Sequence, residues 1–340
     1  MSFLKSKEAV TRTKAILLVV IVIVAACTVG YYILQPRREV KGVINLYTSI
    51  PMATATAVVK DFEASYPGTK VELFRTGSSE VLAKIWAEKQ AGAIKADVIW
   101  IADASAYYNM IEQGLLMKYK SSEAENVPGA MKDPDGYWTG ARLINMIIAY
   151  NTKLVKTPPN SWYDFQKFGK RACTPNPLGS GAMLVTAGTI ANAWGWDFFR
   201  DLRKAGVLVV SGNSEAAAAV VAGEVDVGMT LDYIALGEKK KGAPIEIVWP
   251  KEGVFSIASP VAILSTTKNP DTAKTFVDYA VSKRGQEFMV KENLMPVRID
   301  VTGPTGLPNS KDVKAITIPY RWIADNSENI VSEFEKIMLR

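Results

Sequence analysis

Histidine is absent from all 340 residues of the sequence. Its absence excludes the Ser/His/Asp triad, acid–base catalysis by imidazole and every zinc site that contains a histidine ligand. The only two cysteines, Cys27 and Cys173, supply neither a disulfide framework nor a thiolate metal cage. We expect Cys173 to be a small core residue. We therefore predict a protein without a cofactor that is not an enzyme.

Glycine-rich nucleotide motifs are also missing. Neither GxGxxG nor GxxxxGK[ST] follows any predicted strand, which argues against a dinucleotide or a nucleoside triphosphate held in the usual way. The stretch Leu178-Gly179-Ser180-Gly181 contains GxG but lacks the third glycine, so we interpret it as a loop.

The charge balance points away from nucleic acid as a partner. Lysine and arginine number 40 against 34 acidic residues, a formal net charge of +6, and about half of that excess lies in the first fourteen residues. A small remainder over a long chain is not the electrostatic footprint of a nucleic-acid-binding protein.

A basic leader and a hydrophobic segment occupy residues 1–40. Residues 15–34 form a run without charge that is long enough to cross a membrane as a helix. Val24-Ala25-Ala26-Cys27 resembles the box before a lipidated cysteine, which makes Cys27 a lipidation candidate, and a cleaved signal peptide is the third alternative. We favour a membrane anchor of the first or second kind.

From Lys41 onward, strand and helix patterns alternate. Three predicted strands, 43–48, 71–76 and 96–102, alternate with helices at 53–66 and 79–90, which is the signature of a parallel, doubly wound sheet. Ligands of such sheets lie beyond the carboxyl ends of the strands. The small polar side chains at those ends are Thr48, Ser49, Thr76, Ser78, Ser79, Asp103 and Ser105.

Two helix starts share one pattern, a strand followed by glycine and serine. In the first, Gly77 makes the turn and either Ser78 or Ser79 is predicted to be the N-cap of the next helix. In the second, residues 175–182 follow a strand and place Gly179, Ser180 and Gly181 at a helix start. Helix N-termini present free N–H groups and suit an anionic or oxygen-rich ligand.

The second half of the chain contains its own strands and helices. We interpret residues 137–151 as a long strand that crosses from a first lobe to a second, in which the strand 225–230 ends before Asp232 and Tyr233. Two lobes with matching loops at their strand ends imply a cleft between them.

Several motifs taken together resemble the substrate-binding proteins of bacterial and archaeal ABC importers, in the branch that binds ferric iron, thiamine, sugar phosphates and aminophosphonates. The motifs are Leu-Tyr-Thr-Ser (46–49), Arg-Thr-Gly-Ser-Ser-Glu-Val-Leu (75–82), Ala-Asp-Val-Ile-Trp (96–100), Asn-Pro-Leu-Gly-Ser-Gly (176–181), Ala-Gly-Glu-Val-Asp-Val-Gly-Met (222–229), the segment 241–253 and the segment 268–279.

The resemblance implies an α/β periplasmic-binding-protein-like fold of type II, with a doubly wound mixed sheet in each lobe and two crossing strands. It implies a first lobe of residues 41–140 and 255–340, and a second lobe of residues 141–254. It also implies a monomer on the extracytoplasmic face of the membrane, which captures a small solute and delivers it to an ABC permease.

The sequence leaves two kinds of ligand open, ferric iron and a phosphorylated or phosphonate compound. The ferric-iron binders of this branch carry adjacent tyrosines where this chain has Asp232 and Tyr233, so an iron site would need those two side chains with Tyr47. Alternatively, the two helix starts share a phosphate or phosphonate, and Asp232 holds a hydroxyl or ammonium group. We favour the phosphorylated or phosphonate compound.

The expected ligand-binding set comprises Tyr47, Thr48, Ser49, Thr76, Gly77, Ser78, Ser79, Asp103, Gly179, Ser180, Gly181, Asp232 and Tyr233. For Arg142 on the crossing strand, we expect a structural ion pair with a hinge carboxylate in preference to a ligand contact. An exported enzyme and a ligand-sensing domain without a transport role are the alternatives from other classes.

Overall fold

The computed structural model describes residues 40–340, which form one compact unit. The predicted leader, the hydrophobic segment at 15–34 and Cys27 lie outside the described residues. Within 40–340, no helix combines the length and the hydrophobicity that crossing a membrane requires.

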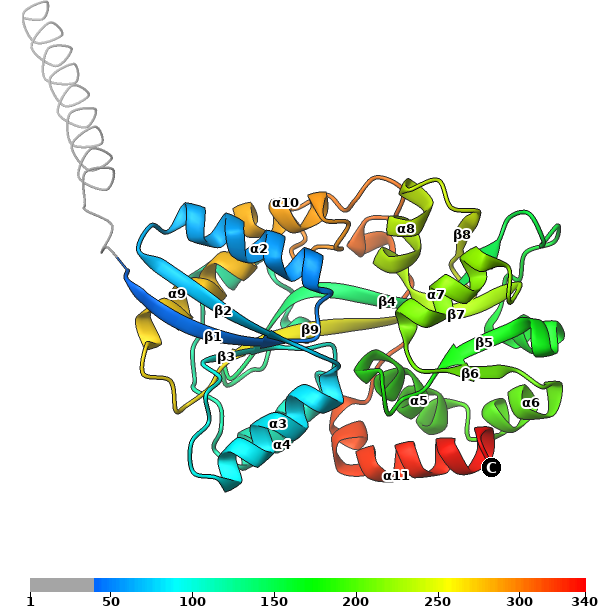
Figure 1. The fold of residues 1–340 in the computed structure, drawn as a ribbon, viewed down its shortest axis with the longest axis horizontal. Helices are drawn as coiled ribbons and strands as arrows, with labels where there is room; N and C mark the ends of the chain where they lie inside the picture. Colours follow the sequence, from blue (N-terminus) through cyan, green and yellow to red (C-terminus); the bar gives the residue numbers. More distant parts are fainter. Residues whose placement is uncertain (1–39) are drawn as a thin grey trace, which may run out of the picture. The chain divides into compact units, whose positions relative to one another are not determined.

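The first lobe is built from parallel strands covered by helices on both sides (Figure 1). Its strands β1 and β2 pair in parallel, as do β1 and β3, which confirms the predicted βαβαβ series. Its elements are β1 (Gly42–Thr48), α2 (Met52–Ser65), β2 (Thr69–Arg75), α3 (Ser78–Gln90), β3 (Val98–Trp100), α4 (Ala106–Glu112), α9 (Pro270–Val281) and α10 (Lys283–Lys291).

The second lobe is likewise built from parallel strands and helices. Its strands β5 and β6 pair in parallel, as do β5 and β7, while β8 lies against β4. Its elements are β5 (Ala172–Pro175), α5 (Gly181–Ala193), α6 (Asp197–Ala205), β6 (Leu208–Val210), α7 (Asn213–Ala222), β7 (Val227–Leu231), α8 (Asp232–Lys240), β8 (Ile245–Val248) and α11 (Tyr320–Met338).

Two long strands, β4 (Thr139–Asn151) and β9 (Phe255–Ile263), connect the lobes. The first part of β4 pairs with β9, and its last part pairs with β7 and β8. One mixed sheet therefore runs through both lobes in the order β2-β1-β3-β9-β4-β7-β5-β6. Both crossing strands are almost completely buried, in keeping with their near-continuous apolar sequences, because elements cover both of their faces.

The C-terminal helix α11 departs from the expected assignment of residues 255–340 to the first lobe. Ile323, Ile330 and Phe334 of α11 are buried in the same hydrophobic cluster as Met183 of α5 and Phe199 of α6. The rings of Phe199 and Phe334 meet edge to face with centroids 5.1 Å apart. The amphipathic pattern of residues 320–338 predicts a helix with one buried face, but it does not say against which lobe that face packs.

Cys173 is fully buried in β5, which confirms the expectation from its sequence context. Burial in apolar surroundings raises the pKa of its thiol to about 12, so the thiol stays protonated at neutral pH.

The packing of α11 predicts a large loss of stability when the aromatic side chain of Phe334, on its buried face, is truncated. Phe334→Ala should lower the free energy of unfolding by about 3–5 kcal/mol, because it empties space in a closed core. The matched control Lys336→Ala lies on the exposed side of the same helix and should stay within about 0.5 kcal/mol. Urea denaturation measures both variants, and equal small effects would contradict the packing of α11 on the second lobe.

Candidate functional site

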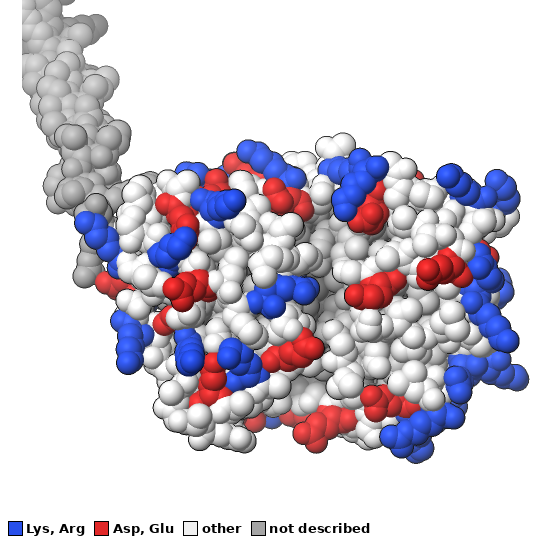
Figure 2. All heavy atoms as spheres, in the orientation of Figure 1, with Lys and Arg blue, Asp and Glu red and all other residues white. Residues whose placement is uncertain are grey.

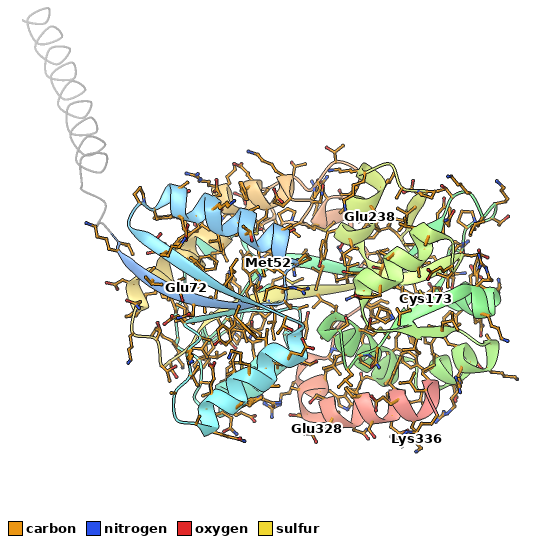
Figure 3. All side chains as sticks on the ribbon, in the orientation of Figure 1. Met52, Glu72, Cys173, Glu238, Glu328 and Lys336 are labelled. Atoms are coloured by element: carbon orange, nitrogen blue, oxygen red, sulfur yellow. The ribbon has the colours of Figure 1, made fainter. Side chains whose placement is uncertain are left out.

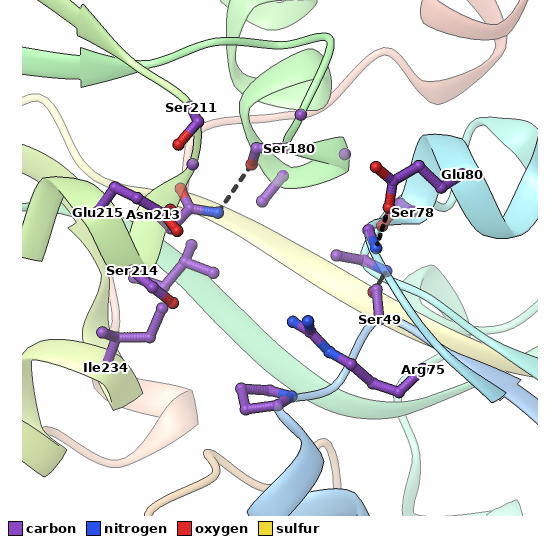
Figure 4. A pocket seen from close by; sticks show the side chains of 18 of the residues that line it. Ser49, Arg75, Ser78, Glu80, Ser180, Ser211, Asn213, Ser214, Glu215 and Ile234 are labelled. Atoms are coloured by element: carbon purple, nitrogen blue, oxygen red, sulfur yellow. Dashed lines mark hydrogen bonds between the residues drawn. The ribbon is translucent and has the colours of Figure 1, made fainter. Parts of the chain in front are cut away.

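A cavity of about 280 Å³ lies between the two lobes, in front of the crossing strands (Figure 4). In the space-filling view, the molecule is hollowed between its halves, with side chains of both charge signs beside the hollow (Figure 2). The residues that line the cavity are Ser49, Pro51, Arg75, Gly77, Ser78, Glu80, Ala102, Arg142, Gly179, Ser180, Gly181, Ala182, Ser211, Gly212, Asn213, Ser214, Glu215, Leu231, Tyr233 and Ile234.

Helix N-termini converge on this cavity. The N-cap residues of α2, α3, α5, α7 and α8, which are Pro51, Gly77, Ser180, Gly212 and Leu231, all line it. Each helix directs the positive end of its peptide dipoles and several free N–H groups toward its N-terminus. The cavity therefore suits an anion.

Carboxylates of the chain itself already occupy some of these helix ends. Glu80 accepts a hydrogen bond of 3.0 Å from the Gly77 N–H and another from the Thr76 hydroxyl, and these bonds hold its pKa below the usual range. In α7, the Glu215 carboxylate folds back onto Gly212. The first turn of α5, by contrast, contains no acidic residue. Asp103 of the first lobe lies beside Gly181, but its hydrogen bonds are to Ser105 and Ala106, so the first N–H groups of α5 are left for an anion from outside.

Ser180 is the N-cap of α5, as the sequence predicts. Its Oγ accepts hydrogen bonds from the Met183 N–H at 3.0 Å and from the Asn213 amide at 2.7 Å. With both acceptor positions used, the hydroxyl proton of Ser180 is left for a ligand. At α3, however, the predicted cap by Ser78 or Ser79 is wrong: Gly77 is the N-cap, because Glu80 three residues later bonds to the Gly77 N–H.

Arg142 differs most from its sequence-based interpretation. The expected ion pair is absent as a close contact: Arg142 is only 1% exposed and forms no close ion pair with any residue of the described range 40–340, although its charge still acts on the buried Asp232. Its Nε reaches the Ser259 hydroxyl at 3.4 Å, its guanidinium lies 5.1 Å from the ring centroid of Tyr233, and one terminal nitrogen has no partner. Arg142 thus brings a buried positive charge to the cavity, and the buried Asp232 carboxylate offsets it only in part, without a close ion pair.

Asp232 is fully buried and does not line the cavity, contrary to the expected ligand contact. Its carboxylate accepts hydrogen bonds from the Asn145 backbone N–H at 3.1 Å and from the Asn145 side chain at 2.6 Å. Burial raises the pKa of Asp232 to about 6, although these bonds, the Tyr233 N–H and the charge of Arg142 oppose the rise. The packing of β4 against α8 turns this side chain inward.

The structure divides the expected ligand-binding residues into three groups. Ser49, Gly77, Ser78, Gly179, Ser180, Gly181 and Tyr233 line the cavity. Ser79 and Asp103 line a second cavity nearby. Tyr47, Thr48, Thr76 and Asp232 line neither of these two cavities, because neighbours inside the lobes take up their polar groups.

The three candidate iron ligands do not converge. The Tyr47 hydroxyl donates to Glu88 at 2.8 Å, its ring packs on Phe74, and burial together with the Glu88 charge raises the pKa of the phenol. Tyr47 is therefore held as a neutral phenol away from the cavity, while Asp232 is bonded to Asn145. Within residues 40–340, no group of three His, Cys, Asp or Glu side chains is arranged to hold a metal ion.

The two lobes touch at the helix starts that the sequence analysis paired. A Cβ atom placed on Gly181 would lie 2.8 Å from Cβ of Ser78 and 3.0 Å from Cβ of Asp103, and one on Gly77 would lie 3.5 Å from the Gly179 carbonyl oxygen. The structure is thus closed at this point, and closure requires a residue without a side chain at position 181.

The segment 211–215 is the part of the site that sequence reasoning missed. It follows β6 and contributes Ser211, Gly212, Asn213, Ser214 and Glu215 to the cavity. The signal was present, since a short strand is again followed by glycine, by serine and by an acidic residue in the first turn of a helix.

Comparisons with known proteins identify the family and the fold. Residues 93–324 match the family of bacterial extracellular solute-binding proteins. Iron uptake protein A1 of Synechocystis sp. is 27% identical over 274 residues, which cover 74% of each chain. The periplasmic binding protein AfuA from Actinobacillus pleuropneumoniae, solved with exogenous fructose-6-phosphate bound, is 26% identical with a TM-score of 0.79, covering 88% of this chain and 99% of its own.

A third protein, iron-bound HitA from Pseudomonas aeruginosa, shares the fold with a TM-score of 0.77 and 22% identity, covering 86% of this chain and 99% of its own.

Burial of Asp232 predicts a pH-dependent stability. The pKa of Asp232 is higher in the folded than in the unfolded protein. The stabilisation that this difference gives to the folded protein is therefore complete below about pH 4, and it is lost as the pH rises through about 6. Compared with Asp232→Asn, the wild-type free energy of unfolding should fall by up to about 3 kcal/mol between pH 4 and pH 7. Urea unfolding of both proteins at several pH values measures the difference, and parallel curves would refute this assignment.

Proposed function

Since the chain belongs to the bacterial extracellular solute-binding proteins, we propose that its cleft captures a small phosphorylated or phosphonate anion. The protein is the extracytoplasmic solute-binding component of an ABC importer, and its family and fold are those of transport proteins.

The buried charge of Arg142, which forms no close ion pair within residues 40–340, carries this proposal. A buried charge without a partner costs several kcal/mol in free energy, so the cleft with Arg142 at its wall is completed by a ligand of opposite charge. The α5 N-terminus, with Ser180 at its cap and no acidic residue in its first turn, provides N–H donors for the same anion. A phosphate group has enough oxygens to accept from both.

The size of the cavity favours an organic ligand over a bare ion. At about 280 Å³, it lies just below the roughly 300–1,000 Å³ typical of small-molecule pockets. The relative from Actinobacillus pleuropneumoniae was solved with fructose-6-phosphate, a ligand of suitable size and charge. Ser49 and Ser214, which lie on opposite sides of the cavity (Figure 4), provide hydroxyl groups for the remainder of such a compound.

Ferric iron is the second candidate, favoured by the name of the Synechocystis relative. An iron site in this chain would have to use Tyr233, because Tyr47 and Asp232 are turned away from the cavity. A single phenolate with serine hydroxyls is a poor donor set for a hard trivalent cation, which prefers several anionic oxygens.

The transport cycle that we propose rests on lobe closure. A ligand that contacts both lobes shifts a pre-existing equilibrium between open and closed forms toward the closed form, which then docks on a membrane permease. Residues 15–34 would keep the protein at the membrane as a hydrophobic helix or, with lipidated Cys27, through an attached lipid.

Loss of the buried positive charge of Arg142 should abolish most of the affinity for an anionic ligand. We expect Arg142→Met to bind fructose 6-phosphate at least about 30-fold more weakly, because the variant lacks the ligand's charge partner. An apolar side chain of similar length keeps the core filled. The matched control Arg171→Met removes an exposed arginine paired with Asp226 and should bind like the wild type. Isothermal titration measures all three, and unchanged affinity of Arg142→Met would overturn the anion proposal.

A side chain at position 181 should prevent closure. We expect Gly181→Val to lose the compaction that fructose 6-phosphate produces in the wild type, because its Cβ would collide with Ser78 and Asp103. Gly237→Val is the matched control, since a Cβ there meets nothing within 4 Å. Small-angle X-ray scattering with and without the compound reports the change. Equal compaction of Gly181→Val and the wild type would contradict the proposed closure.

A further inference from the structure

A second cavity of about 330 Å³, which we call the side cavity, lies where the two lobes meet beside the main site. Its wall in the first lobe comes from α3, α4 and the segment before α4, and its wall in the second lobe from α5 and α11. The Ser78–Gly181 contact lies close by, because Ser79 and Asp103 line the side cavity while Ser78 and Gly181 line the main one.

Asp103 provides a buried carboxylate with one unused oxygen. Only 3% of the residue is exposed, and its Oδ1 accepts hydrogen bonds from the Ser105 N–H at 2.9 Å, the Ser105 hydroxyl and the Ala106 N–H at 3.4 Å. Its Oδ2 accepts no hydrogen bond from any residue in the described range 40–340. Burial raises the pKa of this carboxyl group, so a cation beside it would relieve the desolvation of its charged form.

Glu328 on α11 lines the same cavity from the opposite lobe, and Figure 3 shows where it lies on the helix. Within residues 40–340, it forms no ion pair or hydrogen bond with another side chain. No lysine or arginine lines the side cavity, whereas both carboxylates do. The side cavity therefore differs from the main cavity, which Arg75 and Arg142 line together with Glu80 and Glu215.

The remaining lining fits an organic cation better than a metal ion. Leu184 and Trp86 add apolar surface, and the hydroxyl of Ser79 adds a neutral acceptor. Two carboxylates are fewer than a protein site for a hard divalent cation normally uses, since such sites gather six or more oxygens. An ammonium group on a short alkyl chain can place its N–H donors on the carboxylates and its carbon atoms on the apolar wall.

We propose that the side cavity is a second binding site, for a small alkylammonium ion held between Asp103 and Glu328. Because its two carboxylates belong to different lobes, the cation binds the closed form preferentially. It therefore strengthens binding of any ligand that closes the main site, and that ligand strengthens cation binding by the same factor.

The test uses butylammonium chloride as the probe, with uncharged 1-butanol as a matched control for the alkyl chain. Isothermal titration at constant ionic strength should show saturable binding of butylammonium, and none of 1-butanol. Glu328→Gln should weaken butylammonium binding at least about threefold, as expected for an exposed carboxylate–ammonium pair. Asp103→Asn should weaken it at least about tenfold, while its side-chain oxygen still accepts from the Ser105 N–H.

Glu333→Gln is the control for non-specific charge effects, since Glu333 lies on α11 but does not line the side cavity. It should bind butylammonium like the wild type. Absence of saturable binding, equal binding of 1-butanol, or equal affinities for wild type, Glu328→Gln and Asp103→Asn would overturn the proposal. Direct cation binding needs no phosphate compound, so its failure is distinguishable from a failure of the anion proposal, which the Arg142 variant tests.

Discussion

Several helix N-termini, each with a partial positive charge, meet between the two lobes, and the rest of the structure depends on this constraint. Five helix N-termini and the buried Arg142 direct positive potential into one cavity. Closure brings α3 and α5 so near to one another that Gly181 has no room for a side chain beside Ser78. Such an arrangement is stable only where negative charge balances it. Glu80, Glu215 and Asp232 lie in the first turns of α3, α7 and α8, whereas the first turns of α2 and α5 contain no acidic residue and are left for the ligand.

The hinge follows from the way the sheet is built. The strands β4 and β9 pair with one another and continue into opposite lobes, so the lobes can rotate only if these two strands bend. The chain crosses again before α11, which packs on α5 and α6 although the preceding helices α9 and α10 belong to the first lobe. The first lobe therefore ends before the C-terminus, and α11 packs its buried face on the second lobe, while Arg321 of α11 pairs with Glu112 of α4 at 2.6 Å.

Local patterns in the sequence were sufficient for the order of elements and for the helix starts at the ends of strands. Strand–glycine–serine patterns located the helix starts at Ser78, Ser180 and Gly181, all of which line the cavity, because a helix that follows a parallel strand begins at the carboxyl end of that strand. Such patterns do not predict the direction in which an individual side chain points. Asp232 follows a strand as a ligand-binding residue would, yet hydrogen bonds to Asn145 turn it into the core.

The surroundings of Arg142 could not be predicted from the sequence either. Its position on a crossing strand was evident from the sequence, but whether a carboxylate lies near it depends on residues far away in the chain, such as Ser259 of β9. The lobe on which α11 packs was likewise decided by shape, since Gly188 of α5 leaves room for Ile323 and Ile330.

Native mass spectrometry of the protein purified without added ligand tests the central claim most directly, because it weighs what the closed cleft retains. The account predicts a population heavier by the mass of one organic phosphate or phosphonate compound. A retained mass equal to a ferric ion, alone or with a small inorganic anion, would contradict it.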